Sequence, residues 1–311
     1  MKRTYLLIVF LAVILFLLLS NKIINDMEKR YIYRSDKIIV SDNEDAKKYK
    51  IVKQMKKETE KMFMDFPGTY SVYYLNLNKN LSFGINEHMI FPCASIIKIP
   101  VMLDIYDMVS KKKISFNDEY QYQKRHYVEG GGVIRYSEPG GYYTVRNLCS
   151  LMITESDNIA TDMLIEITGF DNINKKLNEI GCKKTKIERR IFDFNQIEKG
   201  RDNISTTHDV GVILKKLYFN EIFKKEYSQE ILNIMTNVKR KDMIPSKIPE
   251  KVKIAHKTGQ LDRELGDCAI VYQNNNPYIL CLMAMEITDM EKAIELFAVL
   301  SKKIYTDNKK I

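Results

Sequence analysis

The spacing of hydrophobic residues changes several times along the chain, and each change predicts a different element. Glu44–Phe66 is rich in Lys and Glu but carries apolar residues at helical spacing, so we expect a helix that ends at Pro67–Gly68. Tyr70–Leu77 and Leu81–Ile85 are apolar runs on either side of the polar residues Asn78–Asn80. This arrangement predicts a β-hairpin.

Helical spacing then dominates the middle of the chain, roughly residues 95–235. The stretches that carry it are Ile96–Val109, Val145–Thr154, Asp157–Thr168, Ile173–Ile180 and Thr207–Phe219. Ser156 or Asp157 can cap the third of these helices, and Thr206 or Thr207 can cap the last. Short apolar runs then predict strands again, before a closing helix. These last elements are Val252–Lys257, Cys268–Gln273, Tyr278–Ile287 and the helix from about Met290 to Ile304.

The order of these elements is helix, strands, helices, strands, helix. It predicts an α+β fold of three layers (α/β/α), in which strands from both ends of the chain build one antiparallel sheet and an all-helical subdomain is inserted between them. A cleft between such a sheet and its helices is a natural ligand site.

The first residues carry a separate signal. Lys2 and Arg3 precede the uncharged run Tyr5–Leu19, which as a helix would span roughly 22 Å at 1.5 Å per residue. We therefore expect residues 1–24 to be a signal peptide or membrane anchor, 25–45 a polar stalk and 46–311 the functional domain. This arrangement predicts an extracytoplasmic protein that is membrane-anchored through its N-terminal helix, or secreted if the leader is cleaved.

Composition and charge narrow the classes of function. Hydrophobic residues make up 45% and charged residues 29% of the 311 residues, which excludes a disordered, collagen-like or multi-pass membrane chain. Lys and Arg exceed Asp and Glu by 49 to 40, but the excess is spread along the chain and is not interleaved with aromatic residues. We therefore expect no nucleic-acid partner.

Cysteine and histidine give no sign of a metal or disulfide framework. The cysteines form no C-x-x-C pair and are odd in number, and the histidines are scattered without metal-binding spacing. We expect reduced, buried thiols, no metal and no cofactor. The residues concerned are Cys93, Cys149, Cys182, Cys268, Cys281, His88, His126, His208 and His256.

The first candidate for chemistry is the S-x-x-K sequence formed by Ser95 and Lys98. At helical spacing these side chains share one face, so the lysine amine can reach the serine hydroxyl. A desolvated lysine can be neutral enough to accept the hydroxyl proton, and this makes the serine a nucleophile. Two such sequences are expected by chance, and the second, Ser110 with Lys113, lies in a lysine run typical of a solvated surface.

Two further motifs make the Ser95–Lys98 pair informative, because the three together follow a known order. Ser156-Asp157-Asn158 opens a predicted helix, and Lys257-Thr258-Gly259 ends a predicted strand. Together with Ser95-Ile96-Ile97-Lys98, they occur in the order S-x-x-K, S-D-N, K-T-G. The chain thus resembles the class A β-lactamase and penicillin-binding serine hydrolase family over about residues 45–305. The resemblance implies a β-lactamase/transpeptidase-like fold.

The resemblance also implies roles for the motif residues. Ser95 would attack a β-lactam or acyl-D-Ala carbonyl, with Lys98 as candidate base and Ser156 passing a proton to the leaving nitrogen. The Ser95 and Gln260 N–H groups would form the oxyanion hole. Other residues would bind the substrate: Asn158 its side-chain amide, and Lys257 and Thr258 its carboxylate, in the strand that ends at Gly259.

One part of the sequence departs from the family pattern. Class A enzymes use a loop Glu to activate the water that hydrolyses the acyl-enzyme. If Asn195 is aligned with the Asn of the family's E-x-x-x-N, Ile191 occupies the Glu position, and an isoleucine accepts no proton. Asp193 or Glu188 could substitute only with a shifted loop. Deacylation is therefore expected to be slow.

These observations lead to one expectation and two alternatives. We expect a monomeric serine acyl-hydrolase of β-lactamase type with low lactam turnover. The first alternative is a D-Ala-D-Ala peptidase or esterase of cell-wall metabolism, which acts on peptidoglycan peptides. The second is a penicillin-binding or sensor protein that is acylated and stays so. Arg263 is the nearest arginine that could assist the substrate carboxylate, although surface charge also explains it.

Overall fold

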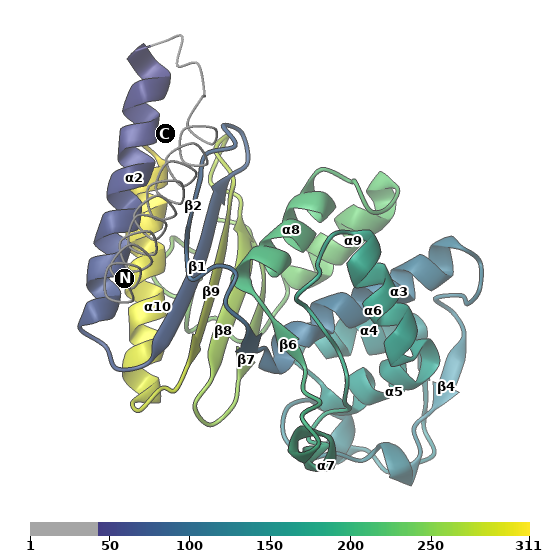
Figure 1. The fold of residues 1–311 in the computed structure, drawn as a ribbon. Helices are drawn as coiled ribbons and strands as arrows, with labels where there is room; N and C mark the ends of the chain where they lie inside the picture. Colours follow the sequence, from purple (N-terminus) through teal and green to yellow (C-terminus); the bar gives the residue numbers. More distant parts are fainter. Residues whose placement is uncertain (1–42) are drawn as a thin grey trace, which may run out of the picture. The chain divides into compact units, whose positions relative to one another are not determined.

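An antiparallel five-stranded sheet forms the middle layer of the computed structural model, which describes residues 43–311 (Figure 1). The strand order is β2-β1-β9-β8-β7. The strands are β1 (Thr69–Asn76), β2 (Ser82–Ile85), β7 (Ile254–Gln260), β8 (Leu265–Val271) and β9 (Tyr278–Met285). The first two come from one end of the described chain and the other three from the opposite end. The predicted α+β architecture is therefore confirmed.

Two long helices cover one face of this sheet. They are α2 (Asn43–Met64), here from Lys48 onward, and α10 (Met290–Asn308), in which the Asp289 carboxylate accepts a hydrogen bond from the Lys292 amide and so caps the first turn. Both place apolar residues against the sheet. These include Val52 and Met55 of α2, Leu296, Phe297 and Leu300 of α10, and Val72, Leu280 and Leu282 of the sheet.

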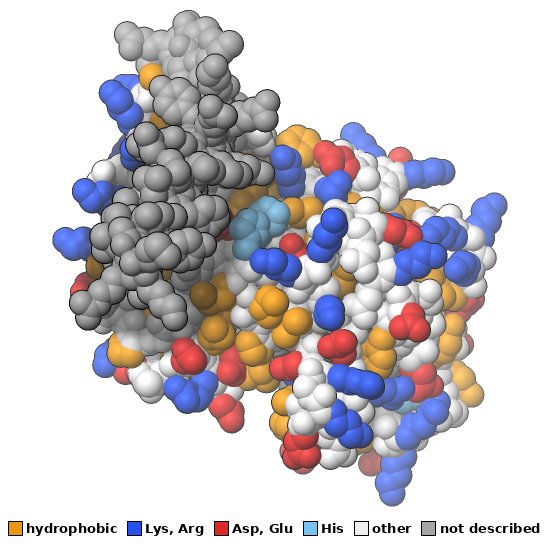
Figure 2. Space-filling model, in the orientation of Figure 1, with side chains coloured by type: hydrophobic (Ala, Val, Ile, Leu, Met, Phe, Trp, Pro, Cys, Tyr) orange, Lys and Arg blue, Asp and Glu red, His pale blue; other side chains and the backbone are white. Residues whose placement is uncertain are grey.

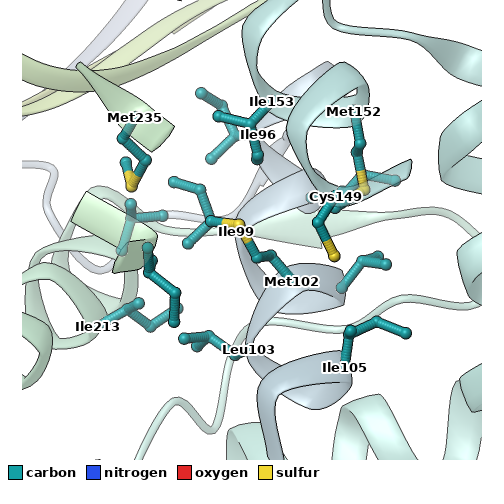
Figure 3. Packing of buried hydrophobic residues seen from close by; sticks show 14 of the residues in the cluster. Ile96, Ile99, Met102, Leu103, Ile105, Cys149, Met152, Ile153, Ile213 and Met235 are labelled. Carbon is teal, nitrogen blue, oxygen red and sulfur yellow. The ribbon is translucent and has the colours of Figure 1, made fainter. Parts of the chain in front are cut away.

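The remaining helices lie on the other side of the sheet. They are α3 (Lys98–Ser110), α4 (Val145–Thr154), α5 (Asn158–Thr168), α6 (Phe170–Glu179), α7 (Phe194–Glu198), α8 (Thr207–Tyr218) and α9 (Lys225–Met235). Helix α3 is central among them and is almost entirely buried. Figure 3 shows Ile99 and Met102 of α3 beside Cys149 and Met152 of α4. The layers belong to the compact unit Lys48–Ile311.

Several details differ from the sequence-based expectation. Residues 257–259 lie within β7 rather than at its end, because the pairing with β8 continues to Gln260 opposite Leu265. Helix α9 and two small sheets were not predicted. These sheets pair β3 (Phe91–Pro92) with β6 (Ile204–Ser205), and β4 (Glu119–Gln121) with β5 (Tyr142–Thr144). The predicted β-hairpin is confirmed as β1 and β2.

Charges of both signs are found on the surface of the molecule. On the face shown in Figure 2, basic and acidic side chains are interspersed over the helices.

Between residues 43 and 311, no helix is both long enough and apolar enough to cross a membrane. The predicted signal or anchor at residues 1–24, and the stalk up to residue 42, lie outside the described residues.

Candidate active site

Ser95 lies on a short 3₁₀ turn, Ala94–Ile97, that leads directly into α3. Ala94 has a φ of 43°, which places it in the left-handed region that non-glycine residues seldom adopt. The next two side chains, Ile96 and Ile97, are buried in the core, and Figure 3 shows Ile96 beside Ile153 of α4. This packing fixes the turn, so the Ser95 hydroxyl is held at the surface of the core.

Lys98 is fully buried, and its amine contacts four oxygen atoms. Nζ lies 3.0 Å from Ser95 Oγ and 2.8 Å from Asn158 Oδ1. It also lies 2.7 Å from the carbonyl oxygen of Ser156 and 3.0 Å from Ser156 Oγ. Burial, with the Lys257 amine as the second cause, holds the pKa of Lys98 well below its usual value, although Asp157 and Asp162 act in the opposite direction.

Ser156 joins the two lysines of the motifs. Its φ of 53° is again left-handed, and its Oγ lies 3.0 Å from the Nζ atoms of both Lys98 and Lys257. Lys257 is also fully buried, and burial lowers its pKa to about 7, with Asp267 opposing this shift and Arg240 adding to it. Three motifs that are far apart in the sequence therefore meet around one hydroxyl group.

Asn158 and Asp157 hold the start of α5 in place. Asn158 Nδ2 donates to the carbonyl of Glu129 at 3.0 Å, which orients Oδ1 toward Lys98. The buried Asp157 carboxylate caps α5 through the Ala160 amide and also accepts the amides of Val133 and Ile134. The side-chain amide proposed to bind substrate is thus itself anchored to the protein.

Strand β7 passes directly against the turn that carries Ser95. A Cβ atom on Gly259 would lie 3.1 Å from the backbone nitrogen of Ser95 and 3.1 Å from the carbonyl oxygen of Cys93, so a larger residue would require this backbone to move by a few tenths of an ångström. The Leu261 amide donates to Glu264 across the hairpin. Because such bonds alternate along an antiparallel pair, the preceding Gln260 N–H points away from β8. β7 is the edge strand, so this N–H is free to face the cavity.

Most of the motif residues line a cavity of about 410 Å³, while Lys98, Asp157 and Lys257 lie buried behind its wall. Its lining includes Ser95, Ser156, Asn158, Thr258, Gly259 and Gln260, together with Gly130, Gly131, Arg189, Ile191, Phe192, Asn203, Lys239 and Arg240. The glycines were missed by the sequence reasoning, although the run Gly130–Gly132 is a visible signal. A Cβ on Gly130 would lie 2.8 Å from Asn158 Nδ2 and 3.0 Å from the Phe192 ring. The backbone of the loop at Gly130–Gly132 therefore packs directly against side chains of the site.

The loop from 187 to 203 forms another wall of the cavity. Ile191 and Phe192 line it, whereas neither Glu188 nor Asp193 is among the described residues that do. Asp193 instead caps α7 through the Gln196 amide. The single carboxylate among the described lining residues is Glu155, at the end of α4.

Two further expectations concern charges near the site. Arg263 does not line the cavity in the described chain; its guanidinium donates to the carbonyls of Ile287 and Glu286. The basic residues among the described lining residues are Arg189, Lys239 and Arg240 instead. All five cysteines are buried and unpaired, and residues 43–311 contain no cluster of three or more His, Cys, Asp or Glu side chains that could hold a metal ion.

Comparisons with known proteins agree with this geometry. The model of the beta-lactamase enzyme family matches residues 54–307. Beta-lactamase VEB-1 of Pseudomonas aeruginosa is 26% identical over 199 residues, 60% of this chain and 65% of that one. A beta-lactamase of Bacteroides uniformis is 26% identical over 57% of this chain and 62% of its own length. The matches thus span slightly less than two thirds of these relatives.

Solved structures cover more of the chain. The structure of PBP-A superposes with a TM-score of 0.77 at 25% identity, over 83% of this chain and 97% of that one. An acyl-enzyme complex of a PBP-A mutant with penicillin G gives a TM-score of 0.78 at 24% identity, over 84% and 98%. The fold is therefore shared nearly end to end with PBP-A.

Proposed function

Because the chain belongs to the beta-lactamase enzyme family, we propose that it is a serine acyl-hydrolase that β-lactams acylate on Ser95 and that releases the acyl group slowly. The observation that carries the proposal is the 3.0 Å contact between Lys98 Nζ and Ser95 Oγ on the wall of a cavity of about 410 Å³. Cavities of several hundred Å³ suit small organic ligands.

Lys98 would act as the base for acylation. Two of its contacts, the Ser156 carbonyl and Asn158 Oδ1, can only accept hydrogen bonds. A neutral amine has two N–H groups for these acceptors and one lone pair, which is left for the proton of the Ser95 hydroxyl. The lowered pKa of Lys98 favours this neutral form at physiological pH.

Acylation then proceeds by bond exchange at the lactam carbonyl. Ser95 Oγ bonds to the carbonyl carbon as its proton passes to Lys98, and the N–H groups of Ser95 and Gln260 stabilise the oxyanion. The C–N bond breaks, and Ser156 transfers its proton to the leaving nitrogen while it regains one from Lys98, which lies 3.0 Å away. The Lys257 ammonium and the Thr258 hydroxyl hold the substrate carboxylate.

Deacylation lacks the corresponding base. Ile191 lines the cavity, and the alignment of Asn195 with the family's E-x-x-x-N matches it to the loop Glu of class A enzymes. An isoleucine side chain cannot activate water. General base catalysis contributes about 10²- to 10⁴-fold, so hydrolysis of the acyl-enzyme should be slower by a factor of that order.

The same observation favours a second candidate function. An enzyme with a slow hydrolytic step and a likeness to PBP-A could serve as a peptidase or esterase on acyl-D-Ala groups of the cell wall, or as a penicillin-binding sensor. Release of D-Ala from a wall peptide supports the peptidase, whereas a persistent penicilloyl adduct without D-Ala release supports the sensor.

Intact-mass spectrometry over time with benzylpenicillin tests the proposal. We expect an adduct of one benzylpenicillin that forms quickly and decays slowly. Ser95→Ala should form none, while the control Ser110→Ala, in the second S-x-x-K sequence, should behave like the native protein. An adduct on Ser95→Ala would overturn the nucleophile assignment.

A further inference from the structure

Two of the five cysteines lie directly opposite each other in the middle of the sheet. Cys268 of β8 and Cys281 of β9 are register partners, so their side chains lie on the same face, in the core that the sheet shares with α3 and α8. Neither residue is exposed to solvent. The next residue in this row is Lys257 of β7, which is the partner of Cys268. The pair therefore lies one strand away from a lysine of the candidate active site.

The hydrogen-bond pattern of the sheet gives this pair a close backbone separation. In line with the register of β7 and β8, the Tyr272 amide donates to the Lys253 carbonyl at 2.9 Å. Because such bonds alternate along an antiparallel strand, Cys268 also bonds toward β7 and not toward β9. Cys268 and Cys281 thus form a non-hydrogen-bonded pair, in which Cα atoms lie about 4.5 Å apart. Disulfides span Cα separations of about 4.4 to 6.8 Å, so the backbone is in place for one.

The three remaining cysteines are placed differently. Cys93 and Cys182 each donate their thiol to a backbone carbonyl, and Cys149 lies on α4 among apolar core residues. Cys268 and Cys281 are therefore the cysteines that the fold itself aligns for a bond.

The folded sheet also protects these two thiols from oxidants. The thiolate, not the thiol, attacks a disulfide. Burial, with the adjacent Cys281 thiol as the second cause, holds the pKa of Cys268 well above its usual value. Reaction with an oxidant therefore requires that β8 and β9 are exposed, as they are before folding is complete.

We propose that Cys268 and Cys281 form a cross-strand disulfide when the chain folds in the presence of a disulfide oxidant, and that the folded sheet then shields the pair in whichever state it was formed. One cysteine thiolate attacks a small disulfide such as oxidised glutathione and releases one glutathione thiol. The second cysteine attacks the resulting mixed disulfide and releases the other. Two electrons and two protons thus pass from the cysteines to the oxidant.

The first test locates the bond by peptide mass. Trypsin cuts after Arg263 and Lys292, which leaves Cys268 and Cys281 in one peptide with no other cysteine. Protein refolded from urea with oxidised and reduced glutathione is denatured, alkylated and digested. We expect this peptide to be unalkylated and lighter than its reduced form by two hydrogen atoms, with the other cysteines alkylated. Two alkylated cysteines in the peptide, or a bond to another cysteine, would overturn the proposal.

The second test exposes protein that was folded under reducing conditions to the same glutathione mixture. We expect both cysteines of the peptide to remain alkylatable over the time in which refolding protein is fully oxidised. Circular dichroism reports that both samples are folded. Oxidation of the folded sample at the same rate would contradict the shielding.

The third test measures stability in the two redox states. A disulfide that fits the native sheet restricts the unfolded chain, so the urea midpoint of the oxidised protein should be higher by about 1 M. Cys281→Ala cannot form the bond and should lose this difference, whereas Cys149→Ala, the control at another buried cysteine, should retain it. An equal or lower midpoint in the oxidised native protein would show that the bond strains the sheet and refute the assignment.

Discussion

Two walls of the active-site cavity are built in opposite ways. The wall that carries Ser95, Ser156 and Lys257 is a network of buried polar groups, in which each amine is held by oxygen atoms at 2.7 to 3.0 Å. The loop wall presents Ile191 and Phe192 beside Arg189 and Asn203, and no carboxylate among its described lining residues. In the proposed mechanism the first wall would supply a base, a proton carrier and a carboxylate site, whereas the loop wall would supply no base for deacylation. The two steps of hydrolysis would then depend on separate parts of the chain, with the groups for acylation alone complete.

The largest effect should follow from removing the proposed base. Lys98→Met keeps the length and apolar stem of the side chain but has no lone pair for the Ser95 proton, so acylation by benzylpenicillin should slow by about 10²- to 10⁴-fold. The rate is measured from the growth of the adduct mass. Lys113→Met, at the surface beyond α3, should leave the rate unchanged. A native rate in Lys98→Met would assign the base to another group.

The next effect concerns the loop wall. Ile191→Glu places a carboxylate in the cavity, so decay of the acyl-enzyme should accelerate by about tenfold or more, while its formation changes little. Ile197→Glu is the matched control, because Ile197 lies on α7 outside the cavity lining. The decay of the penicilloyl adduct in excess buffer measures both. If Ile191→Glu decays no faster, the loop alignment is wrong.

A smaller effect should appear in the pH profile of acylation. The pKa of Lys257 is lowered to about 7, so above this pH the amine loses the charge that would hold the substrate carboxylate. Burial also lowers the pKa of Lys98, and rising pH only increases the fraction of its neutral form. The second-order rate constant should therefore fall above pH 7, toward about tenfold per pH unit. In Lys257→Arg the charge persists, and a fall of the same size in that variant would contradict the assignment.

The smallest effect should come from the hydrogen bond between the loop and α5, and it concerns stability. The Ile191 amide donates to Asp162, a carboxyl whose pKa burial raises to about 6. Because this pKa is higher in the folded than in the unfolded state, the Asp162 carboxyl adds to the free energy of unfolding at low pH. That contribution is lost as the pH rises through about 6. Asp162→Asn keeps the acceptor without the charge. Its free energy of unfolding relative to native should therefore increase by about 1 to 3 kcal/mol between pH 4 and 7.5. Urea unfolding at both pH values measures this, and a constant difference would refute it.

The sequence predicted the parts of the site that depend on short motifs. Ser95 and Lys98 share a face because they are three positions apart, and Asp157 and Thr206 cap the helices where a polar residue precedes a helical run. The layers followed from the order of the elements, because strands from both ends must pair to bury their apolar residues.

The parts that escaped prediction depend on contacts between distant residues. Gly259 has poor strand propensity, yet β7 continues through it because β8 pairs with it. Arg240 rather than Arg263 lines the cavity, and no local pattern distinguishes the two. The glycines at 130 and 131 matter only because Asn158, Phe192 and Ser156 approach them.

The contact at Gly259 limits how this protein could acquire new substrates. There the sheet meets the turn that carries Ser95 as main chain against main chain, so closely that a methyl group on Gly259 would push the turn away by a few tenths of an ångström. The distance between the Ser95 and Gln260 N–H groups, which form the proposed oxyanion hole, is consequently set by the backbone, and exchanges of neighbouring side chains hardly alter it. Selection for a different acyl donor would have to act at the rim, on residues such as Phe192 or Arg240, while the centre is inherited unchanged.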